Sequence, residues 1–142
     1  MPLSVPNIQY LPVSTHTASD AATALGVNIA QIAKSLVFYN VLNNEPILII
    51  TSGSNRVDKE TVGKYLGFKI KTAGPEYVLE KTGFPAGGVP PFSHTSPIRT
   101  LIDQDLLQYD TIYAAAGTPN SLFPISPQKL VHLANAQVVN IY

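Results

Sequence analysis

The stretch KSLVFYNVLNNEPILIITSG, residues 34–53, decides how the rest of the chain is arranged. Its first half is rich in β-branched and aromatic residues, which favour a strand. Residues 43–46, NNEP, are typical of a turn. Residues 47–53, ILIITSG, form a nearly continuous apolar run, as expected of a strand buried on both faces. Because so short a turn joins antiparallel strands, the stretch predicts a hairpin at the centre of a sheet.

Short helices and strands alternate irregularly on both sides of this hairpin. Residues 1–15 predict an extended arm or edge strand, Ser19 offers an N-cap for a helix that ends at Gly26, and Asn28 offers one for a second helix over 29–33. Further helices are predicted over 59–67, capped by Asp58, over 76–83, with Pro75 at the first position, over 104–109, and over 127–135, started by Ser126 and Pro127. Further strands are predicted over 68–73, 98–103, 111–117 and 136–142. The pattern predicts a single α/β domain over 1–142, with a mixed, curled, barrel-like sheet covered by helices.

Composition narrows the functional classes. The 142 residues carry nine Lys plus Arg and nine Asp plus Glu, so no global field attracts nucleic acid, and contact with RNA requires a local patch. The absence of cysteine excludes disulfides, thiolate metal sites and a cysteine nucleophile. No signal-peptide pattern and no apolar run approaching the ~20 residues of a membrane span is present. The sequence therefore predicts a cytoplasmic protein.

Two groups of basic residues each leave two interpretations open. Lys34 opens a predicted strand among uncharged neighbours, and is either a strand-end lysine reaching solvent or an anion-binding lysine at the mouth of a pocket. The basic cluster, defined as Arg56, Lys59, Lys64, Lys69 and Lys71, is either a solvated surface or a phosphate-contacting patch. The histidines, His16, His94 and His132, lack metal-ligand spacing, so no metal site is predicted.

Two glycine-containing loops are the remaining candidates. Residues 83–94, GFPAGGVPPFSH, and residues 114–120, AAAGTPN, combine glycines that permit close approach with prolines that fix the backbone. They are either tight turns or preformed walls whose N–H and C=O groups bind a substrate. The chain contains no G-x-S-x-G elbow, Walker A motif or G-x-G-x-x-G motif.

Five motifs in order resemble the YbaK/aminoacyl-tRNA deacylase family, the stand-alone relatives of the editing domain of bacterial prolyl-tRNA synthetases. They are HTASDAATALGV, IAKSLVF, ILIITSGSNRVD, GGVPPF and AAAGTPN, at 16–27, 32–38, 47–58, 87–92 and 114–120. The resemblance implies a YbaK-like fold with a surface pocket and hydrolysis of the ester that joins a wrong amino acid to the 3′ end of tRNA. It implies no cofactor. The implied partners are the acceptor end of mischarged tRNA and an aminoacyl-tRNA synthetase.

The resemblance also implies residue roles. Lys34 matches the lysine that holds the substrate's 3′ end, and with Gly88 and Gly117 it carries the catalytic prediction. The implied substrate-binding residues are His16, Thr17, Gly87, Val89, Pro90, Phe92, His94, Thr118, Pro119 and Asn120. Ser93 and Lys129 depart from the family pattern, where a glycine and an acidic residue are common.

Two other functions are compatible with these residues. One is a binding module on the same fold that recognises an aminoacyl or nucleotide ligand without turnover, and the departures at Ser93 and Lys129 favour it. The other is a sequence-tolerant RNA binder that uses the basic cluster. The residues do not predict which amino acid is removed, because single methylenes are poorly discriminated by apolar pockets.

Overall fold

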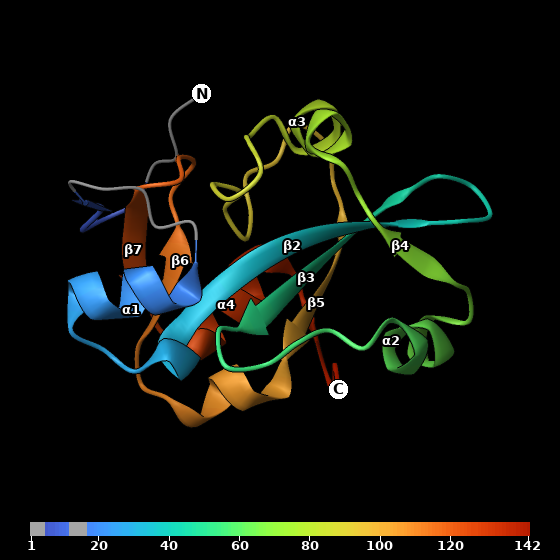
Figure 1. The fold of residues 1–142 in the computed structure, drawn as a ribbon. Coiled ribbons are helices and arrows are strands. Elements are labelled where there is room, and N and C mark those ends of the chain that lie inside the picture. Colours follow the sequence, from blue (N-terminus) through green and yellow to red (C-terminus); the bar gives the residue numbers. More distant parts are fainter. Residues whose placement is uncertain (1–4, 12–16) are drawn as a thin grey trace.

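The predicted hairpin lies at the centre of an eight-stranded sheet in the computed structural model, which describes residues 5–11 and 17–142 (Figure 1). Strands β2 (Ile32–Asn40) and β3 (Pro46–Ser52) pair antiparallel. On the far side of β3, β5 (Arg99–Asp103) and then β8 (Gln137–Val139) add in parallel. The central position and the antiparallel direction predicted for the hairpin are therefore confirmed.

Three strands continue the sheet beyond the start of β2. Strand β6 (Ile112–Ala115) is parallel to β2, and β7 (Ser121–Ile125) and β1 (Gln9–Tyr10) follow antiparallel. Strand β4 (Ile70–Thr72) pairs with the other end of β2. The order is β1-β7-β6-β2-β3-β5-β8, so the sheet is mixed, as predicted, and β1 and β8 form its two edges. The β6–β7 pair stands at a steep angle to β3 and β5, which gives the sheet its curl (Figure 1).

Within residues 5–11 and 17–142, four α-helices surround this sheet: α1 (Ala18–Leu25), α2 (Lys59–Leu66), α3 (Pro75–Thr82) and α4 (Pro127–Ala134). Most predicted boundaries are confirmed: Asp58 and Ser126 cap α2 and α4, and Pro75 begins α3. The prediction of Ser19 as a cap is wrong. The side chain of Thr17 caps α1 instead, by accepting a hydrogen bond from the Asp20 N–H at 3.0 Å.

Two predicted helices are shorter and tighter than expected. The segment after Asn28 forms only a 3₁₀ turn, η1 (Ile29–Gln31), although Asn28 does cap it. It ends early because Ile32 and Ala33 pair with β6 and so belong to β2. Residues Gln104–Gln108 likewise form a 3₁₀ helix, η2. Strand pairing and tight turns therefore override local helical preference at these two places.

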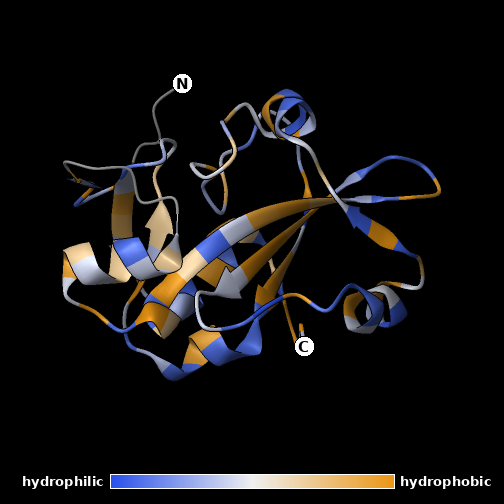
Figure 2. Cartoon of the chain, in the orientation of Figure 1, coloured by the Kyte–Doolittle hydropathy of each residue, from blue (hydrophilic) through white to orange (hydrophobic). Residues whose placement is uncertain are grey.

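The core occupies both faces of β2 and β3. Val37, Leu48 and Ile50 belong to one buried cluster, whereas Phe38 and Ile49 belong to the other. Strand β3 is thus buried on both faces, as its continuous apolar sequence predicts. Figure 2 shows this apolar centre, interrupted on β2 by a short hydrophilic patch. That interruption leads to the candidate site.

In the part of the chain that the structure describes, no helix has the length and hydropathy that a membrane crossing requires.

Candidate active site

An opening in the sheet lies beside the middle of β2. On this edge β2 pairs with β6 only through Ile32 and Ala33, and with β4 only from Phe38 to Asn40. Among the described strands, none pairs with residues 34–37 on this side. The opening separates the two halves of the curled sheet and is where a ligand can reach the backbone of a central strand.

A cleft lies at this opening. It consists of two adjoining cavities of about 630 and 240 Å³. Of the residues that the structure describes, seven line both cavities: Thr17, Ala18, Lys34, Ser35, Leu36, Gly87 and Val89. The cleft thus brings together the start of α1, the middle of β2 and the loop over 83–94, which are distant in sequence. Five of the predicted site residues that the structure describes meet here, because Pro119 lines the smaller cavity beside Thr17, Lys34, Gly87 and Val89.

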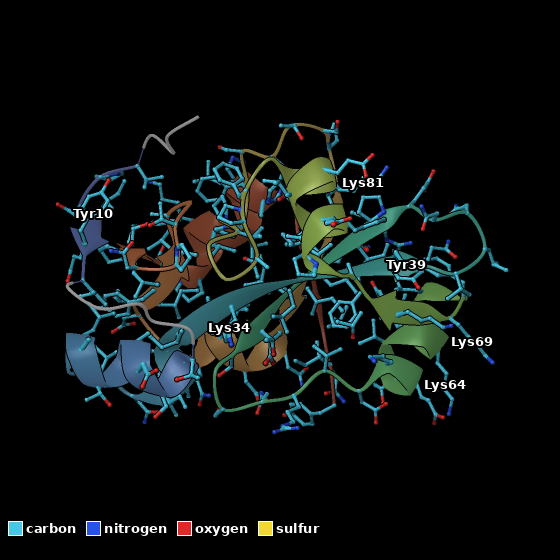
Figure 3. The ribbon with its side chains drawn as sticks, turned by 45° about the horizontal axis from the view of Figure 1, so that its top comes forward. Tyr10, Lys34, Tyr39, Lys64, Lys69 and Lys81 are labelled. Atoms are coloured by element: carbon cyan, nitrogen blue, oxygen red, sulfur yellow. The ribbon has the colours of Figure 1, made fainter. Side chains whose placement is uncertain are left out.

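Lys34 lies on the floor of the cleft, half-buried, on the strand β2 and opposite Thr51 of β3. Figure 3 shows it at the centre of this face, between α1 and the loop over 83–94. Arg56 and Lys59 line the larger cavity as well. No Asp or Glu is among the described residues that line either cavity. Although the chain has no net charge, the cleft is therefore locally basic and suited to an anionic group.

The basic cluster is divided by the fold. Arg56 and Lys59 line the cleft, whereas Lys64 and Lys69 lie away from Lys34, over α2 and the start of β4 (Figure 3). Both of these outer lysines are exposed. The cluster predicted from sequence is thus two features, a part within the cleft and a part outside it.

The two glycine-containing loops pack directly against each other. A Cβ on Gly88 would lie 2.7 Å from the carbonyl carbon of Thr118 and 2.8 Å from its Cα. Gly88 is buried, and its N–H donates to the Pro85 carbonyl at 3.0 Å. Gly117 has a φ of 107°, and a Cβ there would lie 3.2 Å from the Phe84 ring. Neither glycine is among the residues that line the cleft, and both lie where the two loops pack together.

The remaining residues of the second loop are engaged in internal hydrogen bonds. Thr118 Oγ1 donates to Asn120 Oδ1 at 2.9 Å and lies 2.6 Å from Ser121 Oγ. Asn120 Nδ2 donates to the Leu11 carbonyl at 3.1 Å, which ties the loop to the segment after β1. These contacts hold Pro119 in place at the wall of the smaller cavity.

Phe92 and His94 lie outside the cleft. Both line a separate depression of about 570 Å³, together with Ser93. His94 Nε2 bonds the Pro90 carbonyl at 2.7 Å, so this nitrogen carries the proton in the neutral ring. Burial lowers the pKa of His94 below its ordinary value of 6.5, and the bond to Pro90 opposes this shift only in part. His94 therefore stabilises the loop over 83–94 through its bond to Pro90, on the side away from the cleft. His16, also predicted at the site, lies outside the described residues.

The sequence analysis missed a buried carboxylate that fixes the segment carrying Arg56 at the edge of the cleft. Asp103 is fully buried, and its Oδ2 accepts from the Ser52 N–H at 3.0 Å and from Asn55 Nδ2 at 2.9 Å. Asn55 Nδ2 also donates to Asp105 Oδ2 at 2.8 Å. The network fixes the segment that carries Arg56 to the cleft. The only sequence signal was an aspartate at the end of a strand that is otherwise apolar.

Gly53 was also missed as a site residue. It lines the larger cavity, and a Cβ there would lie 2.5 Å from the Ile29 carbonyl oxygen and 2.6 Å from Ala18 Cβ. Only glycine fits at this position, directly after the end of β3, where the backbone lies against Ala18 of α1 and Ile29 of η1. Within residues 5–11 and 17–142, no three His, Asp or Glu side chains are grouped to hold a metal ion.

Known proteins are similar to this chain in sequence and in fold. The sequence model of the aminoacyl-tRNA editing domain family matches residues 13–133. The uncharacterized protein YwhH of Bacillus subtilis (strain 168) is 33% identical over 132 residues, which cover 93% of this chain and 83% of YwhH. The proposed Cys-tRNA(Pro)/Cys-tRNA(Cys) deacylase EbsC of Enterococcus faecalis is 24% identical over 128 residues, covering 88% and 76%. The crystal structure of a proposed trans-editing enzyme for prolyl-tRNA synthetase superimposes with a TM-score of 0.89 at 42% identity, covering 95% and 85%.

Proposed function

Because this chain belongs to the aminoacyl-tRNA editing domain family, we propose that it is a trans-editing hydrolase that cleaves the ester of mischarged aminoacyl-tRNA. The observation that carries the proposal is the cleft, which is lined by Lys34, Arg56 and Lys59 and by no described carboxylate. The 3′ end of tRNA is anionic, and a basic cleft suits it. The names of EbsC and of the structural neighbour support the same class of substrate.

The roles follow from where the residues lie. Lys34 on the floor of the cleft pairs with a phosphate of the terminal nucleotides, with Arg56 and Lys59 assisting at the rim. Gly87 and Val89 form the wall beside the aminoacyl group. Gly88 and Gly117 keep this wall in position through the packing of the two loops. The N–H of Gly88 is bonded to the Pro85 carbonyl, which favours this role for Gly88.

The reaction needs little beyond positioning. Water attacks the acyl carbon of the ester, the bond from that carbon to the ribose oxygen breaks, and a proton passes to the ribose oxygen. The products are the free amino acid and the deacylated tRNA. An aminoacyl ester is already activated, and placement of reacting groups alone can supply several kcal/mol, up to about 7–11 in favourable cases.

Deacylation of a panel of mischarged tRNAs tests this proposal. Wild type should hydrolyse at least one member, and Lys34→Ala should lose most of this activity while keeping the thermal midpoint of the wild type. Lys129→Ala is the matched control, because Lys129 is exposed on α4 and does not line the cleft. Hydrolysis of no member, or full activity in Lys34→Ala, would overturn the mechanism.

The same panel addresses the binding-module alternative. Tight binding of a non-hydrolysable aminoacyl-adenosine with zero turnover would favour it. Ser93 and Lys129, the departures from the family pattern that supported this alternative, both lie outside the cleft. They therefore do not argue against hydrolysis. We expect the protein to act in the cytoplasm, on the acceptor end of tRNA and in partnership with a synthetase, prolyl-tRNA synthetase being the one named for the structural neighbour.

A further inference from the structure

The unpaired edge of β2 exposes specific backbone groups to the cleft. The direction of these groups follows from the hydrogen bonds to β3: Gly53 N–H donates to the Ile32 carbonyl at 2.8 Å, and Asn40 N–H donates to the Glu45 carbonyl at 2.9 Å. In an antiparallel pair such bonds recur at every second residue. The backbone N–H and C=O groups of the even-numbered residues of β2 therefore point towards β3. Ser35 is odd-numbered, so its N–H and C=O point to the opposite edge of β2.

That edge is partly used on either side of Ser35. The Ala33 pairing with β6 ends just before it, and the Val37 carbonyl accepts from the Ala73 N–H at 3.1 Å just after it. Between them, no described strand pairs with Ser35 on this edge. Ser35 lines both cavities of the cleft. Its backbone N–H and C=O thus face the space that a ligand would occupy.

The side chain of Ser35 gives a second, independent indication. Its Oγ is buried and has no hydrogen-bond partner among the described residues. It is the only described side-chain atom of which this is true. A buried hydroxyl left without a partner costs about 1–3 kcal/mol, so such groups call for an explanation, and a ligand group that pairs with it supplies one.

We propose that the aminoacyl group docks on this edge as one added strand residue, bonded to Ser35. The proposal rests on the function proposed above. The α-ammonium group donates to the Ser35 carbonyl, and the ester carbonyl accepts from the Ser35 N–H, as two residues of an antiparallel pair exchange both bonds. Rotation of the Ser35 side chain about χ1 toward the cleft brings its Oγ to the ammonium group as a further acceptor.

This arrangement couples recognition to chemistry. The two Ser35 backbone groups recognise what all α-aminoacyl esters share, an ammonium group and a carbonyl on adjacent carbons. The N–H also lies where negative charge develops on the carbonyl oxygen when water attacks, which is where a fixed donor accelerates the reaction. Ser35 contacts the reacting group, whereas its neighbour Lys34 holds the anionic end of the substrate.

Amide NMR tests this docking directly. The probe is the 3′-amide analogue of the aminoacyl-adenosine that the deacylation panel identifies as substrate, compared with 3′-amino-3′-deoxyadenosine, which lacks the acyl group. The acyl analogue alone should shift the Ser35 amide signal and slow its hydrogen exchange. The amide of Phe38, bonded to β3, serves as the internal control and should respond much less. A response of Gly87 or Val89 without one at Ser35 would overturn the docking mode and leave the proposed hydrolase intact.

Substitutions provide the matching activity test. Ser35→Ala keeps both backbone groups and should lower kcat/KM by about 3- to 10-fold, as the loss of one hydrogen bond predicts. Ser35→Pro also removes the N–H, which the sheet does not use, so the variant should fold and lose about 100-fold in kcat/KM. Leu36→Pro removes an N–H that bonds β3 and should not fold. A folded Ser35→Pro variant with the activity of Ser35→Ala would refute the role of the N–H. If the wild type hydrolysed no member of the mischarged-tRNA panel, the proposed hydrolase function itself would be refuted.

Discussion

Gly88→Ala tests whether the contact between the two glycine-containing loops sets the shape of the cleft. The added Cβ would meet three backbone atoms of Thr118, its carbonyl carbon, Cα and N, at 2.7, 2.8 and 2.9 Å. Ordinary contact begins at 3.4 Å, so one loop has to move by about 0.7 Å relative to the other. Neither side of this contact is a flexible side chain that could rotate away, so the displacement passes to Gly87 and Val89 at the cleft wall.

The structure sets the size of both effects. Overpacking of this kind costs about 1–3 kcal/mol in the free energy of unfolding. In a chain of this length this lowers Tm by about 3 °C per kcal/mol. Misplacement of a positioning element by about 1 Å can cost about 100-fold in rate, so kcat/KM on the mischarged substrate should fall by about 10- to 100-fold.

Thermal denaturation and steady-state deacylation measure these quantities on the same sample. Gly67→Ala is the matched control: Gly67 has a φ of +89° with open space around it, at the end of α2 and outside the cleft. Its substitution should cost about 1–2 kcal/mol through backbone strain and leave activity unchanged. If Gly88→Ala had wild-type stability and activity, the loop contact would have no role. If it lost only as much activity as Gly67→Ala, the effect would be one of stability alone.

Three further predictions concern other parts of the structure. Burial lowers the pKa of His94 below 6.5, so near this pH the unfolded chain binds a proton that the folded chain does not. The free energy of unfolding therefore falls as pH drops below about 6.5 towards the folded pKa. His94→Gln should lose less Tm than wild type between pH 7.5 and 5.5, and an equal loss would contradict this. Asp103→Asn places an amide where the carboxylate accepts from the Ser52 N–H, and should lower the free energy of unfolding, measured by urea denaturation, by about 1–3 kcal/mol. Tyr142→Phe removes a hydrogen bond to Asp105 at the exposed end of the same network, and should move the urea midpoint much less. The double substitution of Lys64 and Lys69 by Ala should weaken binding of deacylated tRNA and flatten its salt dependence, yet leave hydrolysis of a minimal aminoacyl-adenosine unchanged; unaltered tRNA affinity would exclude these lysines from the interface.

Local sequence signals predicted the elements well, because each signal acts within a few residues. The hairpin turn, the caps Asp58 and Ser126 and the terminating Gly26 and Gly83 are all confirmed. The errors have the same local origin. Ser19 and Thr17 are both able to cap, and the choice between them depends on where the chain enters α1.

Long-range pairing decided what the sequence did not reveal. The opening beside Ser35 exists because β6 and β4, from segments far apart in the chain, each cover a different part of the same edge of β2. Asp103 and Asn55 are 48 positions apart and meet only because β5 lies beside β3. Gly88 matched a family motif, but only the position of Thr118 shows that Gly88 is packed against the second loop. Such features depend on register, which composition and periodicity do not specify.

The two cavities of the cleft differ in chemistry, and this difference orients the proposed substrate. The larger cavity carries Arg56, Lys59 and polar groups, whereas the smaller is lined mainly by small and apolar residues, among them Ala21 and Leu122. A nucleotide carries phosphate and an amino acid carries its own side chain, so the larger cavity suits the first and the smaller, at about 240 Å³, suits the second. The ester lies between these two groups, and the residues shared by both cavities include Lys34 and Ser35. The place where the sheet is unpaired is therefore also the place where the scissile bond of such a substrate would lie.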